Sequence, residues 1–223
     1  MSDVYEVSVI IPTYNRKRSL MRCLKQMPSD VEVIVVDDGS VDGTSDAVRS
    51  LCESNIRCLT IPNSGPASAR NAGLEVARGG LIAFTDDDCV PLPPWPAPLV
   101  ERLRRSGSDV AGVGGRVRPL VDSAIAKYYT IHRILEPPAS VSYLVTANCC
   151  YKQEILKLVR GFDTGLKEPG GEDPGLSMKI RKEGFSFVYE PGAVVYHDYR
   201  NSVFDFARTF YRYGRGCSFV MAA

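Results

Sequence analysis

In the first half of the chain, short apolar runs that are typical of buried strands alternate with segments that are typical of helices. Strands are predicted over residues 7–11, 31–36 and 56–61, and a fourth strand begins at Leu81. The segments between them have helical spacing or helix-start residues, so a helix is expected in each gap. Strands and helices that alternate in this way form a parallel sheet, in which every strand ends at the same edge.

The second half has a less regular pattern. Five prolines between residues 91 and 98 predict a stiff connection around Trp95, the only tryptophan, which we expect to pack in the core. The sequence then predicts further strands over residues 110–117, 144–151, 185–189 and 193–197, and helices over residues 99–103, 124–135 and 172–184. The two halves together predict one α/β domain over residues 1–223, with a mixed, mostly parallel central sheet flanked by helices.

The strand that begins at Leu81 ends in three consecutive carboxylates, Asp86, Asp87 and Asp88. Open α/β sheets bind ligands at this edge, and three adjacent anions are costly there unless a cation or hydrogen-bond donors offset their repulsion. On an extended backbone Asp86 and Asp88 point to one side, so the pair can share a divalent metal or divide a metal and a ribose between them. The alternative is a solvated acidic turn that caps the next helix.

Composition narrows the range of functions. The chain has 27 Lys and Arg against 26 Asp and Glu, a formal charge of +1, which argues against a dedicated nucleic-acid binder. Seven cysteines without Cys-x-x-Cys spacing indicate reduced thiols in a cytosolic protein rather than a disulfide framework or a zinc site. No apolar stretch approaches the length of a membrane span, so we expect a cytoplasmic protein.

Six short motifs follow one another along nearly the whole chain: Val-Ile-Ile-Pro-Thr-Tyr-Asn, Val-Val-Asp-Asp-Gly-Ser, Gly-Pro-Ala-Ser-Ala-Arg-Asn-Ala-Gly, Phe-Thr-Asp-Asp-Asp, Gly-Gly-Glu-Asp and Val-Val-Tyr-His. None is specific alone, but their ordered coincidence resembles the family 2 glycosyltransferases, which have the GT-A fold. The resemblance implies an inverting transfer of a sugar from a nucleotide-sugar, most often a UDP-sugar, to a hydroxyl acceptor. The acceptor is a glycan, a lipid-linked molecule or a small molecule, as in the synthesis of cell-envelope polysaccharide and glycolipid.

The resemblance also assigns the metal ligands. Asp88 should bind a divalent cation, Mn²⁺ or Mg²⁺, and Asp86 should bind the cation or the ribose of the donor. His197 matches the family's late metal-ligand histidine, although a hydrogen-bonded structural histidine is the alternative.

Nucleotide recognition is expected at the ends of the first two strands. Tyr14 can stack on the base, the backbone around Thr13 can bond the edge of the base, and Asp38 can accept the imide N–H of a uracil. Arg70 suits a phosphate or a base carbonyl, or it pairs with the acidic cluster instead. The whole predicted nucleotide-binding set is Pro12, Thr13, Tyr14, Asn15, Asp38, Gly65, Arg70, Asp86 and Asp87.

The acceptor hydroxyl needs a base, and the resemblance assigns this role to Asp173, with Glu172 orienting the acceptor. The alternative is a pair of acids that stabilise a helix N-terminus. Residues 1–118 are thus expected to bind the nucleotide-sugar, and residues 119–223 to form the acceptor-binding half. The pocket predicted for the acceptor and the donor sugar comprises Gly114, Gly115, Thr146, Asn148 and Gly171.

The C-terminal segment 203–215 mixes aromatic and basic residues. An amphipathic helix of this kind is a candidate for peripheral contact with the inner face of the cell membrane, and packing of its aromatic face on the domain is the alternative. Relatives often continue into further helices or a membrane segment, so the resemblance implies a chain that is cut short.

Two other classes of function compete with this interpretation. A sugar nucleotidyltransferase shares the parallel-sheet layout, but the glycine-rich signature with a basic residue that it needs near the N-terminus is missing. A catalytically inactive module that binds nucleotide or glycan would not need the candidate catalytic carboxylates, all of which the sequence contains.

Overall fold

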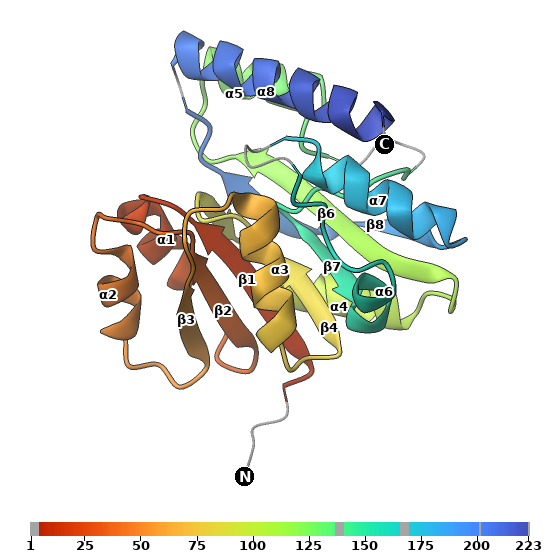
Figure 1. Ribbon diagram of the computed structural model, residues 1–223, viewed down its shortest axis with the longest axis horizontal. Helices are drawn as coiled ribbons and strands as arrows, with labels where there is room; N and C mark the ends of the chain where they lie inside the picture. The colour runs from red at the N-terminus through yellow and green to blue at the C-terminus, as the bar shows by residue number, and fades with distance from the viewer. Residues whose placement is uncertain (1–4, 137–140, 166–169, 201, 223) are drawn as a thin grey trace.

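The computed structural model describes residues 5–136, 141–165, 170–200 and 202–222 (Figure 1). The strands are β1 (Val7–Thr13), β2 (Glu32–Asp37), β3 (Ile56–Thr60), β4 (Leu81–Phe84), β5 (Cys89–Pro91), β6 (Val110–Pro119), β7 (Cys149–Lys152) and β8 (Ser186–His197). The helices are α1 (Lys17–Leu24), α2 (Thr44–Arg49), α3 (Pro66–Val76), α4 (Ala97–Arg104), α5 (Ala124–Ile131), α6 (Gln153–Leu158), α7 (Glu172–Lys182) and α8 (Val203–Ala222).

All these strands join one sheet in the order β3-β2-β1-β4-β7-β6-β8-β5. Strands β1 to β4 are parallel to one another, β7 is antiparallel to both β4 and β6, and β8 is parallel to β6. The predicted mixed, mostly parallel sheet is therefore confirmed. Because β1, β2 and β4 run in one direction, the loops after Thr13, Asp37 and Phe84 leave the sheet at the same edge, which is where the candidate site lies.

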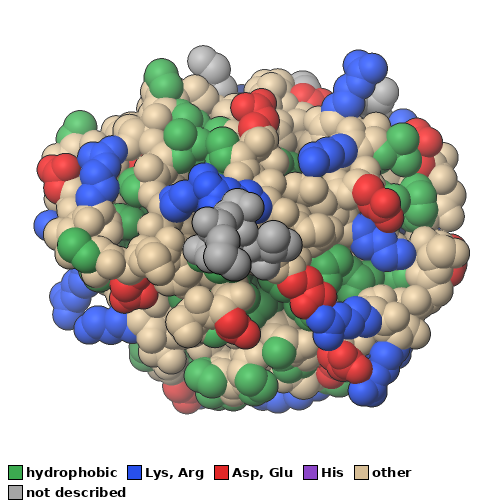
Figure 2. Space-filling view, turned by 90° about the horizontal axis from the view of Figure 1, so that it is seen from below, with side chains coloured by type: hydrophobic (Ala, Val, Ile, Leu, Met, Phe, Trp, Pro, Cys, Tyr) green, Lys and Arg blue, Asp and Glu red, His purple; other side chains and the backbone are tan. Residues whose placement is uncertain are grey.

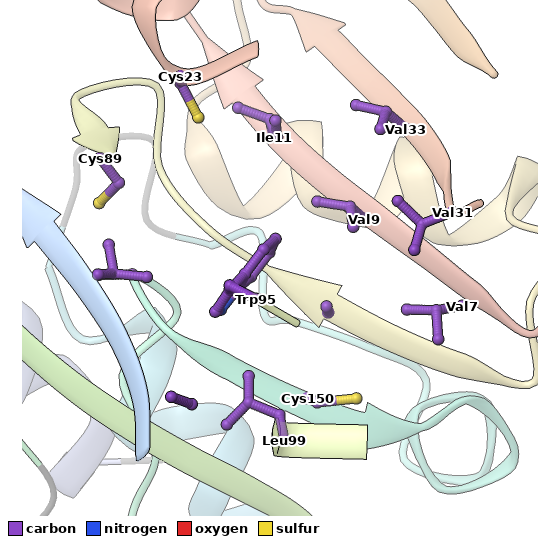
Figure 3. Packing of buried hydrophobic residues seen from close by; sticks show 14 of the residues in the cluster. Val7, Val9, Ile11, Cys23, Val31, Val33, Cys89, Trp95, Leu99 and Cys150 are labelled. Atoms are coloured by element: carbon purple, nitrogen blue, oxygen red, sulfur yellow. The ribbon is translucent and has the colours of Figure 1, made fainter. Parts of the chain in front are cut away.

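Alternating side chains of β1 divide the core between the two faces of the sheet. Val7, Val9 and Ile11 pack on one face with Trp95, whereas Ile10 packs on the other face. Figure 3 shows Trp95 within the first of these clusters. The predicted packing role of Trp95 is confirmed, since its side chain is buried and its indole N–H donates to Asn148 Oδ1 at 2.9 Å.

Two predictions for the second half were wrong in detail, and two short elements were missed. The strand expected over residues 144–151 is present only as β7, because residues 146–148 form a turn in which Asn148 N donates to Val145 O at 3.1 Å. The runs 185–189 and 193–197 belong to the single strand β8, whose pairing with β6 shifts register between Gly115 and Arg116. The short elements β5 and α6 were not predicted.

Helices α5 and α8 lie side by side across the end of the molecule opposite the N-terminus (Figure 1). Their aromatic side chains are in contact: the Tyr128 ring lies 5.2 Å from Phe206 and 5.7 Å from Phe210, between centroids. The expected packing of aromatic residues from segment 203–215 on the domain is therefore observed for this face of α8. In the described residues, no helix has the length and apolar character needed to cross a bilayer. All seven cysteines are free, as predicted.

Candidate active site

A cavity of about 1190 Å³ lies at the edge where the parallel strands end. Small-molecule sites are commonly about 300–1,000 Å³, so this cavity has room for a donor and part of an acceptor. It brings together these predicted site residues: Pro12, Thr13, Tyr14, Asp38, Gly65, Arg70, Asp86, Asp87, Asp88, Thr146, Gly171, Glu172, Asp173 and His197.

The three consecutive aspartates form a tight turn rather than an extended segment, and Cys89 N donates to Asp86 O at 3.0 Å across this turn. The turn brings the three carboxylates to donors from three different segments of the chain. Asp86 binds Arg70 at 2.8 Å, Asp87 accepts from Thr13 Oγ1 at 2.8 Å, and Asp88 forms a close ion pair with Arg16. The solvated-turn alternative is therefore not observed, because intramolecular donors offset the repulsion between the anions.

Arg16 is a site residue that sequence reasoning missed. Its guanidinium contacts Asp87 at 3.0 Å as well as Asp88, so one cation holds both carboxylates beside the end of β1. Burial raises the pKa of Asp87 to about 7, although Arg16 opposes the shift. A basic residue directly after the Pro-Thr-Tyr-Asn exit loop was the signal that could have identified this partner.

Four potential metal ligands converge beside this turn. One ligand atom each from Asp86, Asp88, Cys89 and His197 lies within 4.8 Å of all the others. Pairing of β5 with β8 creates this arrangement, since Cys89 lies opposite His197 and Asp198 N donates to Asp88 O at 3.0 Å. Cys89 was not predicted to take part.

The donor atoms of this cluster fit a divalent cation. Asp88 Oδ1 lies 3.4 Å from His197 Nε2, and both Asp88 Oδ1 and His197 Nδ1 are buried without a hydrogen bond to any described residue. Burial opposes ionisation of Asp88, but His197 and Arg16 outweigh it and hold its pKa below the usual value. An ionised carboxylate beside an imidazole nitrogen suits Mn²⁺ better than Mg²⁺, which prefers oxygen ligands.

The predicted base-binding residues lie around the ends of β1 and β2. Tyr14 is 49% exposed at the cavity, where its ring is accessible for stacking. Asp38 is buried and accepts hydrogen bonds from Ser64 N at 2.7 Å and Gly65 N at 2.9 Å, so it fixes the loop that begins α3. Its N–H donates to Thr13 O at 2.9 Å, which ties the two strand exits together.

Asn15 lies outside the residues that line the cavity. Its Oδ1 accepts from Val41 N and its own N–H donates to Ser40 Oγ, both at 2.8 Å. These two bonds join the loops after β1 and β2. Asn15 therefore shapes the loop, and we do not retain it as a nucleotide contact.

Arg70 connects the two walls of the cavity. The buried guanidinium binds Asp86 at 2.8 Å and Glu172 Oε1 at 3.3 Å, and its carbon lies 5.7 Å from the centroid of the Phe162 ring. The proposed pairing of Arg70 with the acidic cluster is therefore observed. This single side chain links α3 and the end of β4 to the first turn of α7.

Asp173 occupies the opposite wall, in the first turn of α7. Its Oδ2 accepts from Thr146 N at 3.0 Å, whereas its Oδ1 is buried and accepts no hydrogen bond from any described residue. Burial raises the pKa of Asp173 to about 7, repulsion from Glu172 acts in the same direction, and Arg70 opposes both. Because its one bond goes to Thr146 and not to the end of its own helix, Asp173 does not act as a helix cap.

Glu172 differs from its neighbour in that both of its oxygens have partners. Oε1 binds Arg70, and Oε2 accepts from Gly170 N at 2.6 Å. Gly171, with φ of 92°, begins α7 in a left-handed conformation that favours glycine.

Three residues of the predicted sugar pocket, Gly114, Gly115 and Asn148, lie outside the residues that line the cavity. Gly114 is paired with Cys149 inside the sheet, and a Cβ at Gly115 would lie 2.6 Å from Ala193 O. The close approach inferred from the glycines is thus made by neighbouring backbone and the Asn148 side chain. Asn148 is buried and donates to Arg116 O and Ala193 O, both at 2.9 Å, so it is a core residue.

Helix α8 supplies a wall of the cavity that sequence reasoning missed. Phe206, Phe210 and Tyr213 line the cavity, and burial together with anionic neighbours that include Asp173 raises the pKa of the Tyr213 phenol. The contact that positions α8 is made by glycines: a Cβ at Gly171 would lie 2.6 Å from Gly216 O, and one at Gly216 would overlap Gly170 O.

Comparison with known proteins gives a consistent result. A family model described as "Glycosyl transferase family 2" matches residues 8–159. The pre-mycofactocin glycosyltransferase of Mycobacterium tuberculosis is 33% identical over 214 residues, which cover 90% of this chain and 44% of that protein. The chain thus spans less than half the length of this relative.

Solved structures with the same architecture are GT-A glycosyltransferases. The mannosyltransferase PcManGT from Pyrobaculum calidifontis, in complex with GDP-Man and Mn²⁺, has a TM-score of 0.72 and 25% identity, over 91% of this chain and 59% of that chain. Residues 1–349 of S. aureus TarS, in complex with UDP-GlcNAc, have a TM-score of 0.67 and 21% identity, over 88% and 59% of the two chains.

Proposed function

The chain belongs to glycosyl transferase family 2, and on that premise we propose that it transfers a sugar, with inversion, from a UDP-sugar to a hydroxyl acceptor. One observation carries the proposal. A single cavity holds the metal-ligand cluster of Asp86, Asp88 and His197 on one wall and the unpaired Oδ1 of Asp173 on another, with Arg70 joining the two. The leaving group of the donor can therefore be stabilised in the same cavity in which the acceptor hydroxyl loses its proton.

Asp88 and His197, with Asp86, would hold a divalent cation, for which Mn²⁺ is our first choice. When bound, such an ion supplies positive charge that stabilises the leaving diphosphate. The carboxylate oxygens and the imidazole nitrogen of this cluster support Mn²⁺, as does the complex of PcManGT with GDP-Man and Mn²⁺. Burial raises the pKa of the Cys89 thiol, so we do not count its sulfur as a ligand.

The nucleoside would lie against the ends of β1 and β2. Pro12, Thr13 and Tyr14 would contact the base from one side, and Asp38 and Gly65 from the other. Asp38 keeps acceptor capacity beyond its bonds to the α3 loop, since an ionised carboxylate can accept about four hydrogen bonds. Uracil, with its imide N–H, suits this acceptor.

Asp173 would act as the general base and take the acceptor proton on Oδ1. A base works best when its pKa is close to the working pH, and the pKa of Asp173, about 7, meets this condition. Glu172 is the weaker candidate, because Arg70 and Gly170 N already occupy its oxygens. Its proposed role is to keep Arg70 between Asp86 and the acceptor wall.

In this proposal the two halves of the chain have different roles. Residues 1–118 would bind the donor, and residues 119–223 would contribute the acceptor groove, the base and His197. Thr146 belongs to the acceptor groove through its N–H, which holds Asp173 in place.

Product analysis tests the proposal. The protein is incubated with Mn²⁺ and a panel of UDP-sugars, with GDP-mannose as a second donor class because of the likeness to PcManGT, and the released phosphates are identified. Release of UDP that Asp173→Asn abolishes is the expected result. In a parallel incubation with UTP and a sugar 1-phosphate, release of pyrophosphate would indicate a nucleotidyltransferase. Binding of the sugar donors without turnover would indicate an inactive module.

A further inference from the structure

The six arginines that line the cavity differ in whether an acidic side chain offsets their charge. Four of them form ion pairs with carboxylates: Arg16, Arg70, Arg133 and Arg200. The side chains of Arg208 and Arg212, both on α8, form no ion pair or hydrogen bond with any residue that the structure describes. The cavity wall therefore contains two arginines whose charge is not offset within the described part of the chain.

Elsewhere on the molecule, basic side chains lie beside acidic ones. Figure 2, a view from below Figure 1, shows Lys and Arg intermingled with Asp and Glu. Helix α4 is an example, because Arg105 pairs at 2.6 Å with Glu101, four residues before it. On α8 the residue four positions after Arg208 is instead a second arginine, Arg212, and like charges at this spacing on a helix repel each other. This repulsion is relieved if an anion binds between the two side chains.

Arg212 lies next to the wall of the cavity that α7 forms. Its carbonyl oxygen would be 2.8 Å from a Cβ at Gly170, just before the first turn of α7, which contains Asp173. Arg208 lies about one helical turn away and lines the same cavity, as does Thr209. These three residues therefore border the part of the cavity that the proposed function assigns to the acceptor.

We propose that Arg208 and Arg212 bind a phosphate group that the acceptor carries. One guanidinium presents a fork of donors that satisfies the two oxygens of a carboxylate, whereas two guanidinium groups suit the three oxygens of a phosphate. A phosphate monoester has a charge of about −1.5 to −2 at pH 7, which balances two arginines. The hydroxyl of Thr209 can donate a further hydrogen bond.

This inference rests on the proposed function, because it takes the wall at α7 as the acceptor side of the cavity. It narrows the acceptor to a hydroxyl compound that also carries a phosphate. The diphosphate of the donor is the competing source of a phosphate in the same cavity. In the proposed function, however, the cation held by Asp86, Asp88 and His197 offsets the charge of that diphosphate, so Arg208 and Arg212 are not needed for it.

Calorimetric titration of glycerol 3-phosphate in metal-free buffer tests the inference, since this probe carries both a phosphate and hydroxyl groups. Wild-type protein should bind it but should not bind glycerol, its neutral counterpart. Arg208→Gln combined with Arg212→Gln should weaken the binding by at least about tenfold, because charge-assisted hydrogen bonds are lost. Arg18→Gln combined with Arg102→Gln is the matched control: it makes the same change in net charge at two exposed arginines outside the cavity, and it should bind as the wild type does.

Titration of UDP with Mn²⁺ into the Arg208 and Arg212 double variant separates the two sources of phosphate, and UDP should bind it as tightly as it binds the wild type. Three results would overturn the inference: no binding of glycerol 3-phosphate to the wild type, equal binding to the double variant, or weaker UDP binding by the double variant. The last would assign the two arginines to the diphosphate of the donor. If the wild type bound glycerol 3-phosphate through these arginines but bound no UDP, the phosphate site would stand and only the proposed donor would be contradicted.

Discussion

The wall of the cavity at the ends of β1, β2 and β4 places each carboxylate beside at least one cationic or hydrogen-bond donor, and its one unbonded oxygen, Asp88 Oδ1, lies 3.4 Å from His197 Nε2. At the wall formed by α7, Asp173 Oδ1 is buried and accepts no hydrogen bond from any described residue. Asp87 and Asp173 are both buried acids whose pKa is about 7. Asp87 is nevertheless tied by Thr13 and Arg16, while Asp173 keeps one oxygen available for a proton from a ligand. Thus a shifted pKa does not by itself identify a base, and the oxygen without a hydrogen-bond partner distinguishes Asp173 from Asp87.

The largest expected effect is on the transfer rate. It distinguishes the donor wall, at the ends of β1, β2 and β4, from the acceptor wall, at α7. Asp173→Asn removes the proton acceptor but preserves the shape of the side chain, so the transfer rate should fall by a factor of about 10²–10⁴. UDP binding, measured by calorimetry, should stay unchanged because the donor wall is untouched. Asp163→Asn, on the surface, is the control and should retain full activity. If Asp173→Asn weakened UDP binding by the same factor as it lowered the transfer rate, the two walls would not act separately.

Arg70→Met tests the link between the walls. The substitution leaves Asp86 and the mostly buried Glu172 without their shared cation, so the free energy of unfolding should fall by about 2–4 kcal/mol, less than for a fully buried pair because Asp86 is partly exposed.

Arg104→Met is the matched control for Arg70→Met, since it breaks an exposed ion pair with Glu6. Because this pair is exposed and screened by solvent, its loss should lower the free energy of unfolding far less than Arg70→Met does. Urea denaturation of both variants gives the comparison, and similar losses would contradict a special role for Arg70.

The close contact of Gly216 with Gly170 and Gly171 can be tested with two substitutions in α8, one at Gly216 and a control at Gly214. Gly216→Ala forces a methyl group against Gly170 O, so it should destabilise the protein by about 1–3 kcal/mol and shift α8 away from the acceptor wall. A Cβ at Gly214 meets nothing within 4 Å, so Gly214→Ala should be neutral or stabilising by up to about 1 kcal/mol. Thermal unfolding distinguishes the two, and an unchanged melting temperature for Gly216→Ala would rule out this close contact.

The smallest expected effect is the change of the transfer rate with pH. The raised pKa of Asp173, about 7, means that the base is protonated and inactive at lower pH. The transfer rate should therefore rise with pH and level off above the pKa, and one unit below the pKa it should be about tenfold lower than on the plateau. The measurement is release of nucleoside diphosphate against pH, at saturating metal. A rate that is constant from pH 5 to 8, the range in which such a base titrates, would contradict the assignment of Asp173.

The donor wall could be predicted from sequence because its residues follow directly after apolar strands. Parallel strands bring their ends to one edge, so Thr13, Asp38 and Asp86 to Asp88 were placed together without any knowledge of side-chain contacts. The partner of Asp88 was harder to predict, since the tight turn at Asp86 to Cys89 and not the strand itself directs each carboxylate.

The acceptor wall could be predicted only in part. Glu172 and Asp173 were recognised from a motif, but Gly114, Gly115 and Asn148 were misplaced, because close packing and ligand binding leave the same small or polar residues in a sequence. The contact of Gly216 with residues 170 and 171 is made by backbone, across more than 40 residues of chain. No local pattern specifies such a contact.

Calorimetric titration of UDP, with and without Mn²⁺, into wild-type protein and Asp88→Ala tests the central claim most directly. We expect UDP binding that requires Mn²⁺, that Asp88→Ala abolishes and that Asp173→Asn retains, since the metal cluster and the base occupy different walls of one cavity. UDP binding that is equal in the wild type and Asp88→Ala, or absent with every divalent ion tested, would contradict the account.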